Sequence, residues 1–402
     1  MRRLYLAPID SQGVKAEAAH HPRLVWAVGV IVMVLAGLAG LGVLLVKQPF
    51  GFDLWAYVFA ARHLLAGEPL YSAEPKMPAG PFGEYHYAPI VAVPFALLAP
   101  LPFWLAVAVW VGLNTGIAGA IGVHLIRPLP RDARPWAVAA FVLFLPTILE
   151  ISLGNLNLLT VGLCLVAWSQ RRRAPAAGTI LAIAIGVKLL PLTLVLFYLA
   201  SGRYRVVAWT VAVGIVGLLA TAIAFARDFP GYITVLMALK DSHWDTDFIA
   251  NARPAEVAAI LGSPVGRWLL PFTALATATL GGLAARRTPR DETHLHHLAL
   301  AFAPYLALFS LLWIPYLVFS LPLLASTFRK ALLLSQGQAR RVLIASVTLS
   351  WLLMQVVGAE EDVRPLVAHL LGLLVLLAAA VAVVLVARRD DTTDTVAAPV
   401  AA

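Results

Sequence analysis

The stretch KQPFGFDLWAYVFAARHLLAGEPLYSAEPKMPAGPFGEYHYA, Lys47 to Ala88, separates two strongly apolar runs. It carries Asp53 just after the first run, which places a carboxylate at a membrane surface. From Asp53 to Gly67 apolar residues recur with helical spacing, which predicts an amphipathic interfacial helix that Gly67 ends. Its expected apolar stripe comprises Leu54, Tyr57, Val58, Ala61 and Leu65. The remainder, rich in Pro, Gly and aromatics, predicts a loop folded back over the bilayer.

The composition excludes a soluble globular protein. Of 402 residues, 61% are hydrophobic and 13% charged, and the mean hydropathy is +0.85, far above the balance of a soluble domain. The net charge of +9 suggests nucleic acid as a partner, but the basic residues fall in short clusters between apolar runs, as in cytoplasmic loops. We therefore expect a polytopic membrane protein with membrane lipids, and no nucleic acid, as partners.

The single cysteine, Cys164, lies inside an apolar run. One cysteine excludes an internal disulfide and a cysteine-based metal site. We expect a buried packing residue.

Basic clusters fix the expected topology, because cytoplasmic loops of membrane proteins are enriched in Lys and Arg. The clusters are Arg2–Arg23, Arg127–Arg134, Arg171–Arg173, Arg203–Arg205, Arg286–Arg290, Phe328–Arg341 and Arg388–Arg389. If all face the cytoplasm, the chain crosses the membrane an even number of times between any two. This predicts an all-α bundle of about twelve spans: a cytoplasmic tail 1–23, one transmembrane domain 24–387 and a cytoplasmic tail 388–402. The large external loops are 47–87, with the interfacial helix, and 227–263.

The expected spans begin with Leu24–Val46, which is too long for a cleavable signal sequence and is interpreted as a signal anchor. The others are Phe103–Ile126, Pro135–Glu150, Asn155–Ser169, Tyr204–Ala226, Pro264–Ala285, a pair within His294–Phe328, Val342–Val357 and Pro365–Ala387. Tyr87–Pro100 is short and broken by prolines, so we expect a re-entrant or half-buried segment. Ala174–Ala200 has basic clusters at both ends, which favours a hairpin of two short helices turning near Lys188–Pro191; one long tilted helix also fits.

Asp53 has two interpretations. A carboxylate at the start of a helix is favoured as an N-cap. The same position keeps it ionised, which suits a general base. The other acids expected outside are Glu74, Glu84, Asp228, Asp241, Asp245 and Asp247.

Lys188 stands within apolar residues, where a charge is costly unless it reaches water, a partner or an anion. It either snorkels or contacts a lipid-linked phosphate. Asn155 and Asn157 either join helices by hydrogen bonds or line the site.

Two further polar motifs have ordinary explanations. Asp245-Thr246-Asp247 has the D-x-D spacing that binds a metal in nucleotide-sugar enzymes, but the chain lacks a Gly-rich nucleotide-binding unit, so we expect a solvated pair. His294, His296 and His297 resemble a metal cluster; we expect a polar helix end on the cytoplasmic side.

Five motifs in order carry a resemblance to a known family: Phe52-Asp53 with Tyr57; Leu65-Ala66-Gly67-Glu68-Pro69-Leu70-Tyr71; Tyr85-His86-Tyr87-Ala88-Pro89; Gly154-Asn155-Leu156-Asn157; and Gly186-Val187-Lys188-Leu189-Leu190-Pro191. Over about Phe50 to Tyr204 the chain resembles the family 87 glycosyltransferases of the GT-C superfamily. These are polyprenyl-phosphate-mannose-dependent alpha-1,2-mannosyltransferases of the bacterial envelope.

The resemblance implies a GT-C-type transferase of the bacterial plasma membrane, with its active site on the extracytoplasmic side. The implied donor is a polyprenyl-phosphate sugar, mannose being the expected sugar. The implied acceptor is a hydroxyl of a glycolipid or glycan, glycosylated with inversion. Asp53 matches the acidic base, and no metal or cofactor is expected. The residues assigned to substrate binding are Tyr57, Arg62, His86, Tyr87, Asn155, Asn157, Lys188, Trp313 and Tyr316.

One departure leaves the sugar and the acceptor open. Where the family shows Ser-Pro, a Trp and then one or two His, this chain reads Ser310-Leu311-Leu312-Trp313-Ile314-Pro315-Tyr316, with the Trp kept and the His absent. A transporter or lipid flippase remains the alternative function, since it is also polytopic with intramembrane charge. Against it stand the gathering of polar residues on one side and the lack of a visible inverted repeat. A non-catalytic scaffold leaves the buried charge of Lys188 unexplained.

Overall fold

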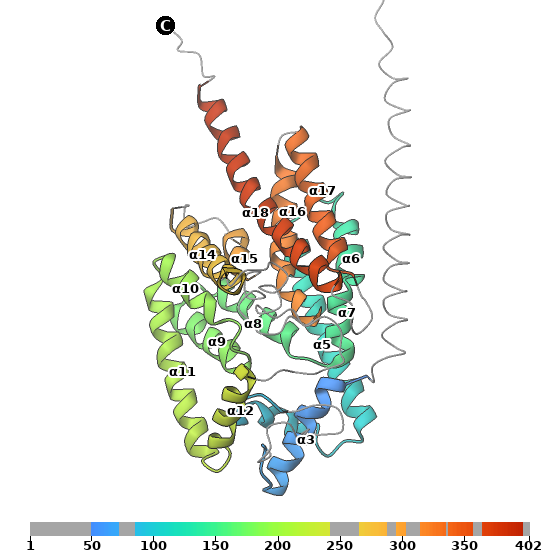
Figure 1. Cartoon of the computed structure of the whole chain (residues 1–402), viewed down its shortest axis with the longest axis vertical. Coiled ribbons are helices and arrows are strands. Elements are labelled where there is room, and N and C mark those ends of the chain that lie inside the picture. Colours follow the sequence, from blue (N-terminus) through green and yellow to red (C-terminus); the bar gives the residue numbers. More distant parts are fainter. Residues whose placement is uncertain are drawn as a thin grey trace, which may run out of the picture.

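The structure is a computed structural model that describes residues 50–71, 85–241, 265–287, 295–302, 314–334, 337–356 and 364–396. Over these ranges the chain forms fifteen α-helices and two 3-10 helices, and no strand (Figure 1). The all-helical class expected from the sequence is therefore confirmed. The N-terminal tail, the run Leu24–Val46, the turn Glu360–Asp362 and residues 397–402 lie outside the described residues, whereas α18 continues to Val396, into the predicted C-terminal tail.

The helices follow one another closely along the chain. The first elements are α3 (Phe52–Ala66), α4 (Pro89–Ala92), the 3-10 helix η1 (Val93–Leu97), α5 (Phe103–Ile126), α6 (Arg134–Val142) and α7 (Leu145–Leu153). The central ones are α8 (Asn157–Ser169), α9 (Ala174–Val187), α10 (Leu192–Ala200), α11 (Tyr204–Ala224) and α12 (Phe229–Asp241). The last are α14 (Val265–Arg287), α15 (Leu295–Phe302), the 3-10 helix η3 (Ile314–Ser320), α16 (Leu321–Leu333), α17 (Gln338–Leu353) and α18 (Arg364–Val396).

Three helical segments among the described residues are long and apolar enough to cross a membrane. They are α5, α11 and the continuous run of η3 and α16. The span predicted at Phe103–Ile126 has the same bounds as α5, and the prediction beginning at Tyr204 is confirmed by α11. The protein is thus a helical membrane protein, and its arrangement in about twelve spans stays a prediction.

The span predicted at Pro135–Glu150 is not one straight helix. It is divided into α6 and α7, which are bent by 46° at the break. The break precedes Leu145-Pro146, because proline lacks the N–H that would continue the hydrogen bonding of α6 and fits the first turn of a new helix.

The segment Tyr87–Pro100 contains only the short elements α4 and η1, packed against α3. Neither is long enough to span a bilayer, which needs about 20 helical residues. The segment is therefore not a full span, and its re-entrant or half-buried position stays a prediction.

The predicted break near Lys188–Pro191 is confirmed, since α9 ends at Val187 and α10 begins at Leu192. The outer ends of the two helices meet, because Nη1 of Arg203 donates a hydrogen bond to the carbonyl of Arg171 at 3.3 Å. One long helix is thereby ruled out, and the chain turns back at Lys188.

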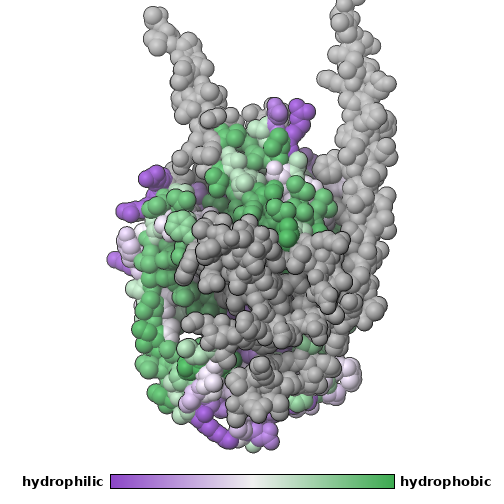
Figure 2. All heavy atoms as spheres, in the orientation of Figure 1, coloured by the Kyte–Doolittle hydropathy of each residue, from purple (hydrophilic) through white to green (hydrophobic). Residues whose placement is uncertain are grey.

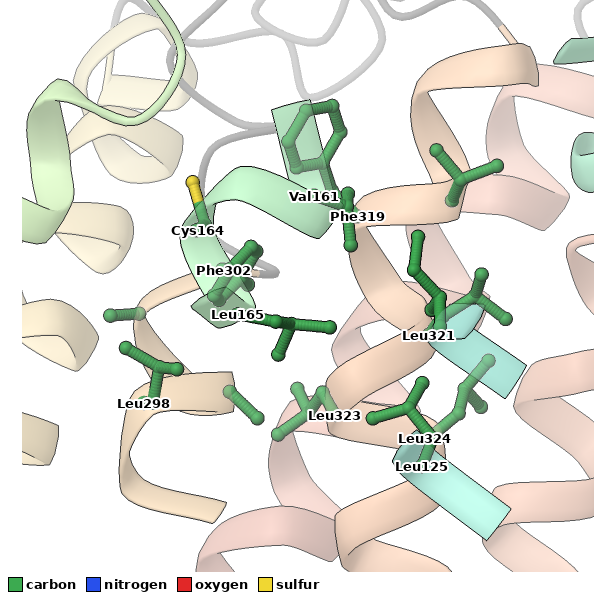
Figure 3. Close-up of a cluster of buried hydrophobic side chains, with 14 of the residues drawn as sticks. Leu125, Val161, Cys164, Leu165, Leu298, Phe302, Phe319, Leu321, Leu323 and Leu324 are labelled. Carbon is green, nitrogen blue, oxygen red and sulfur yellow. The ribbon is translucent and has the colours of Figure 1, made fainter. Parts of the chain in front are cut away.

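The main core gathers around α8. Figure 3 shows Cys164, Val161 and Leu165 of α8 in the same cluster of buried side chains as Phe302 of α15 and Leu321 of α16. Cys164 is fully buried, as expected.

The predicted histidine-rich helix end is buried, which corrects the expectation of a polar end. His296 and His297 are 3% and 6% exposed, because α14 and α16 enclose α15. The ring of His296 contacts Oγ of Ser326 and the carbonyl of Ala380 at 3.1 and 3.0 Å, which satisfies its two nitrogens. His294 lies outside the described residues.

Helix α3 lies at one end of the bundle, beside α12 (Figure 1). Gly67 ends it in the left-handed conformation (φ 69°), as predicted, with its N–H bonded to the carbonyls of His63 and Leu64. Most of the predicted stripe is buried, but Leu65 is 64% exposed and corrects that prediction, because the last turn extends past the elements that cover the helix.

Candidate active site

Two glycines bring the start of α3 against the turn between α7 and α8. Gly51 and Gly154 have positive φ, 78° and 76°, which a residue with a side chain adopts at a cost. The N–H of Gly51 donates to the carbonyl of Ser152 at 2.8 Å. A Cβ on Gly154 would lie 2.9 Å from the Cβ of Leu54, so only glycine allows this approach.

The variant Gly154→Ala should therefore separate α3 from this turn. We expect a loss of about 1 to 3 kcal/mol in unfolding free energy, from the strained φ and the contact with Leu54. Activity should fall at least about tenfold as the groups of the candidate site move apart. Thermal unfolding and activity measurements test this, with Gly214→Ala as the control, since a Cβ there meets nothing within 4 Å. A Gly154→Ala protein with normal stability and rate would contradict the role of the turn.

A chain of hydrogen bonds starts at Asp53 and runs inward. Nδ2 of Asn155 donates to Oδ2 of Asp53 at 2.7 Å. Nζ of Lys188 donates to Oδ1 of Asn155 at 3.0 Å and to Oδ1 of Asn157 at 2.5 Å. The carboxylate and the ammonium are thus linked through one amide. Asp53, Asn155, Asn157 and Lys188, which sequence reasoning selected separately, are brought together in one network.

Glu150 completes this network and was missed as a site residue. Its side chain is fully buried; Oε1 accepts from the N–H groups of Asn157 (2.5 Å) and Leu158 (3.2 Å), and Oε2 accepts from Nδ2 of Asn157 (2.7 Å). These three bonds fix Asn157 so that its Oδ1 faces Lys188. The sequence did contain a signal for Glu150: it lies in the same short stretch as Asn155 and Asn157, E-I-S-L-G-N-L-N.

Asp53 lies in the first turn of α3 and does not cap this helix. The N-cap of α3 is Gly51, with no side-chain cap, so the interpretation of Asp53 as the N-cap is wrong: the residue lies inside the first turn. Helix α3 is not among the candidate spans. Burial raises the pKa of Asp53 to about 6, while the charge of Lys188 and the bond from Asn155 act in the opposite direction.

Aromatic rings surround the ammonium of Lys188. Its Nζ lies 4.4 Å from the ring centre of Tyr316 and 5.9 Å from that of Tyr87. The hydroxyl of Tyr57 donates to that of Tyr87 at 3.0 Å. Burial raises the pKa of Tyr57 and Tyr87, so both phenols stay protonated at neutral pH.

The remaining predicted site residues lie apart from this network or outside the described residues. Arg62 donates to the carbonyls of Ala99 (2.9 Å) and Leu101 (3.2 Å), which anchors the end of η1. His86 is half-buried beside Tyr87. The residues outside the described ranges are Trp313, Glu74, Glu84, Asp245 and Asp247.

Asp228 helps join the chain after α3 to the start of α12. Its Oδ1 accepts from the N–H of Leu70 at 2.8 Å, and Nη1 of Arg227 donates to the carbonyl of Gly67 at 2.8 Å. The start of α12 therefore holds the chain that leaves α3. The carboxylate of Asp228 thus has a structural hydrogen bond, to the N–H of Leu70. Asp241 is the last residue of α12.

The structure is thus a helical membrane bundle in which a half-buried carboxylate is linked through one amide to an ammonium. The model of glycosyltransferase family 87 (GT87) matches residues 85–315, more than half of the chain. The chain belongs to this family and is a membrane glycosyltransferase. The match includes Glu150, Asn155 and Lys188, and begins after α3. Searches of the curated proteins and of the solved structures found no match.

Proposed function

We propose that the protein transfers mannose from a polyprenyl-phosphate carrier to a hydroxyl of a glycolipid or glycan acceptor, with inversion at the anomeric carbon. The observation that carries this proposal is the short bridge Asp53–Asn155–Lys188, which holds a base and a cation at one site. A sugar transfer from a phosphate needs both groups, one for the incoming hydroxyl and one for the leaving phosphate.

Asp53 acts as the general base. Asn155 donates a hydrogen bond to Oδ2 of Asp53, and we assign Oδ1 of Asp53 to the acceptor hydroxyl. As the acceptor oxygen forms its bond to the anomeric carbon, its proton passes to Asp53. A positioned carboxylate contributes about 100 to 10,000-fold to such a step.

Lys188 stabilises the leaving phosphate. An ammonium has three N–H groups, and two of them donate to Asn155 and Asn157. The third is assigned to a phosphate oxygen, on which negative charge grows as its bond to the sugar breaks. Tyr87 and Tyr316 complete the surroundings of this cation.

The site is assigned to the extracytoplasmic side of a bacterial plasma membrane. Helix α11 leads from the basic turn at Arg203 to the end of the bundle that carries α12 and α3. Lys- and Arg-rich turns favour the cytoplasm, which puts α3 and the network outside.

A transfer assay tests the function. Membrane vesicles that contain the protein are given radiolabelled polyprenyl-phosphate mannose, and labelled glycolipid or glycan is measured. Transfer should require the prenyl-phosphate donor, with a nucleotide-linked mannose as the inactive control. Movement of the labelled donor across the membrane without any glycosylated product would instead indicate a flippase.

The pH dependence of transfer should show the base directly. Asp53 acts only when ionised, and its pKa is about 6. Therefore kcat/KM should be constant above about pH 7 and fall about tenfold per pH unit below pH 6. Rates measured in vesicles between pH 5 and 8 test this, since a profile that stays flat to pH 5 would exclude Asp53 as the titrating base.

A further inference from the structure

Three segments bring arginines together at the end of the bundle away from α3. Arg171 lies in the turn between α8 and α9, Arg203 in the turn between α10 and α11, and Arg286 in the last turn of α14. The guanidinium carbons of Arg171 and Arg203 lie 4.7 and 5.4 Å from the ring centre of the same residue, Trp168. A Cβ on Gly202 would lie 3.7 Å from Nε of Arg286, so the third arginine lies over the same turn.

Hydrogen bonds hold two of these cations in place. Nη1 of Arg171 donates to the carbonyl of Trp168 at 3.2 Å, and Nη1 of Arg203 donates to the carbonyl of Arg171 at 3.3 Å. Burial lowers the pKa of Arg171, and the neighbouring charge of Arg172 lowers it further. The buried Nε of Arg171 has no hydrogen-bond partner among the described residues. A buried donor of this kind favours an acceptor supplied by a ligand.

The helices around this cluster supply no carboxylate. The sequence has no Asp or Glu between Glu150 and Asp228, and none within α14. The same segments contribute Arg171, Arg172, Arg173, Arg203, Arg205, Arg286 and Arg287. The next acids along the chain, Asp291 and Glu292, lie outside the described residues. This excess of fixed positive charge fits an anion.

An apolar surface continues from the cluster along α11. Trp209, Val211, Ile215 and Val216 are 46%, 49%, 53% and 66% exposed, on a helix that is apolar enough to span the bilayer. Figure 2 shows hydrophobic residues along the edge where α11 lies, with hydrophilic residues above them. An anion with acyl chains matches both surfaces, whereas inorganic phosphate matches only the arginines.

We propose that the Arg171–Arg203–Arg286 cluster binds the phosphate of an anionic phospholipid headgroup, with the acyl chains along α11. Planar guanidinium groups bind phosphate oxygens in pairs of hydrogen bonds, and Trp168 keeps two of them in position. This site is separate from the proposed transfer site, and it does not depend on which sugar is transferred.

The test is lipid binding to the full chain in a neutral detergent, followed by native mass spectrometry and thermal unfolding. The probes are phosphatidylglycerol, phosphatidylcholine and inorganic phosphate. Phosphatidylglycerol should bind and raise the unfolding temperature. The double variant Arg171→Gln/Arg203→Gln should bind it at least about tenfold more weakly. The matched control is Arg131→Gln/Arg341→Gln, which removes two exposed arginines elsewhere and should bind like the original protein.

Several results would overturn the proposal. One is equal binding of phosphatidylcholine, and another is an equal stabilising effect of inorganic phosphate. A third is an equal loss of binding in the double variant and its control. If the double variant does not fold, the original protein still decides: phosphatidylglycerol with a photoreactive group on its acyl chain should label the Trp209–Val216 face of α11, and labelling confined to other helices would refute the site.

Discussion

The variant Asp53→Asn should lose at least about 100-fold in transfer rate while remaining folded. Asparagine has nearly the shape of aspartate, and its Oδ1 still accepts the bond from Asn155. It cannot take a proton from the acceptor hydroxyl at neutral pH. The rate should therefore fall in kcat, with little change in donor affinity.

The stability of this variant should be equal or higher, and the sign follows from the pKa. Folding raises the pKa of Asp53 from 3.8 to about 6, so this group favours the folded state below pH 3.8, and that contribution is lost as pH rises through about 6. At neutral pH the ionised Asp53 costs the folded state at most about 3 kcal/mol, because one unit corresponds to about 1.4 kcal/mol. The asparagine variant removes this cost.

Thermal unfolding and transfer are measured on the same preparation. The control is Asp132→Asn, the same chemical change at an exposed residue in the α5–α6 turn, which should alter neither quantity. A folded Asp53→Asn protein with the original rate would mean that another carboxylate is the general base, and Glu74 and Glu84 would be the first to be tested. A destabilised variant would contradict the predicted sign of the stability change.

The variant Lys188→Met should weaken binding of the prenyl-phosphate donor by about 1 to 3 kcal/mol, the contribution of a charge-assisted hydrogen bond. The effect on transfer should be larger than the effect on binding. Removing the ammonium leaves Oδ1 of Asn155 and of Asn157 without this donor, and takes positive charge away from Asp53 and Glu150.

A second readout separates an electrostatic role from simple packing. Because the charge of Lys188 lowers the pKa of Asp53, Lys188→Met should move the acidic limb of the pH–rate profile above pH 6. Lys188→Arg keeps the charge and should keep that limb in place, although its geometry differs. Unchanged donor affinity together with an unchanged limb in the methionine variant would reduce Lys188 to a snorkelling residue.

Elements with strong local boundaries were predictable from the sequence. Helix α5 has the predicted bounds because Pro102 and Arg127 enclose a run of 24 mostly apolar residues. The break after Val187 was predictable because Pro191 cannot continue α9, and the end of α3 followed from Gly67. Asp53, Asn155 and Lys188 were each selected from their own motifs, whereas the hydrogen bonds that join them were not predicted.

Features that depend on tertiary contacts were not predictable. The bend between α6 and α7 is a different case: hydropathy gives no sign of it, because the apolar run is uninterrupted, and the local signal was Pro146 in the first turn of α7. Glu150 is buried because the Gly154 turn folds Asn157 back onto it, and no local pattern encodes this return. His296 is satisfied by Ser326 and Ala380, which lie far away in sequence.

The short lengths of α8 and α9 determine how substrates reach the site. With 13 and 14 residues, these helices cover about 20 Å each, whereas the hydrocarbon core of a bilayer is about 30 Å thick. If their arginine-rich ends lie at the inner boundary, Asn155 and Lys188 lie about 10 Å below the outer boundary. A carrier lipid would then enter sideways from the bilayer, with its phosphate drawn beneath the level of the surrounding headgroups. The acceptor would have to descend past α3 to meet it.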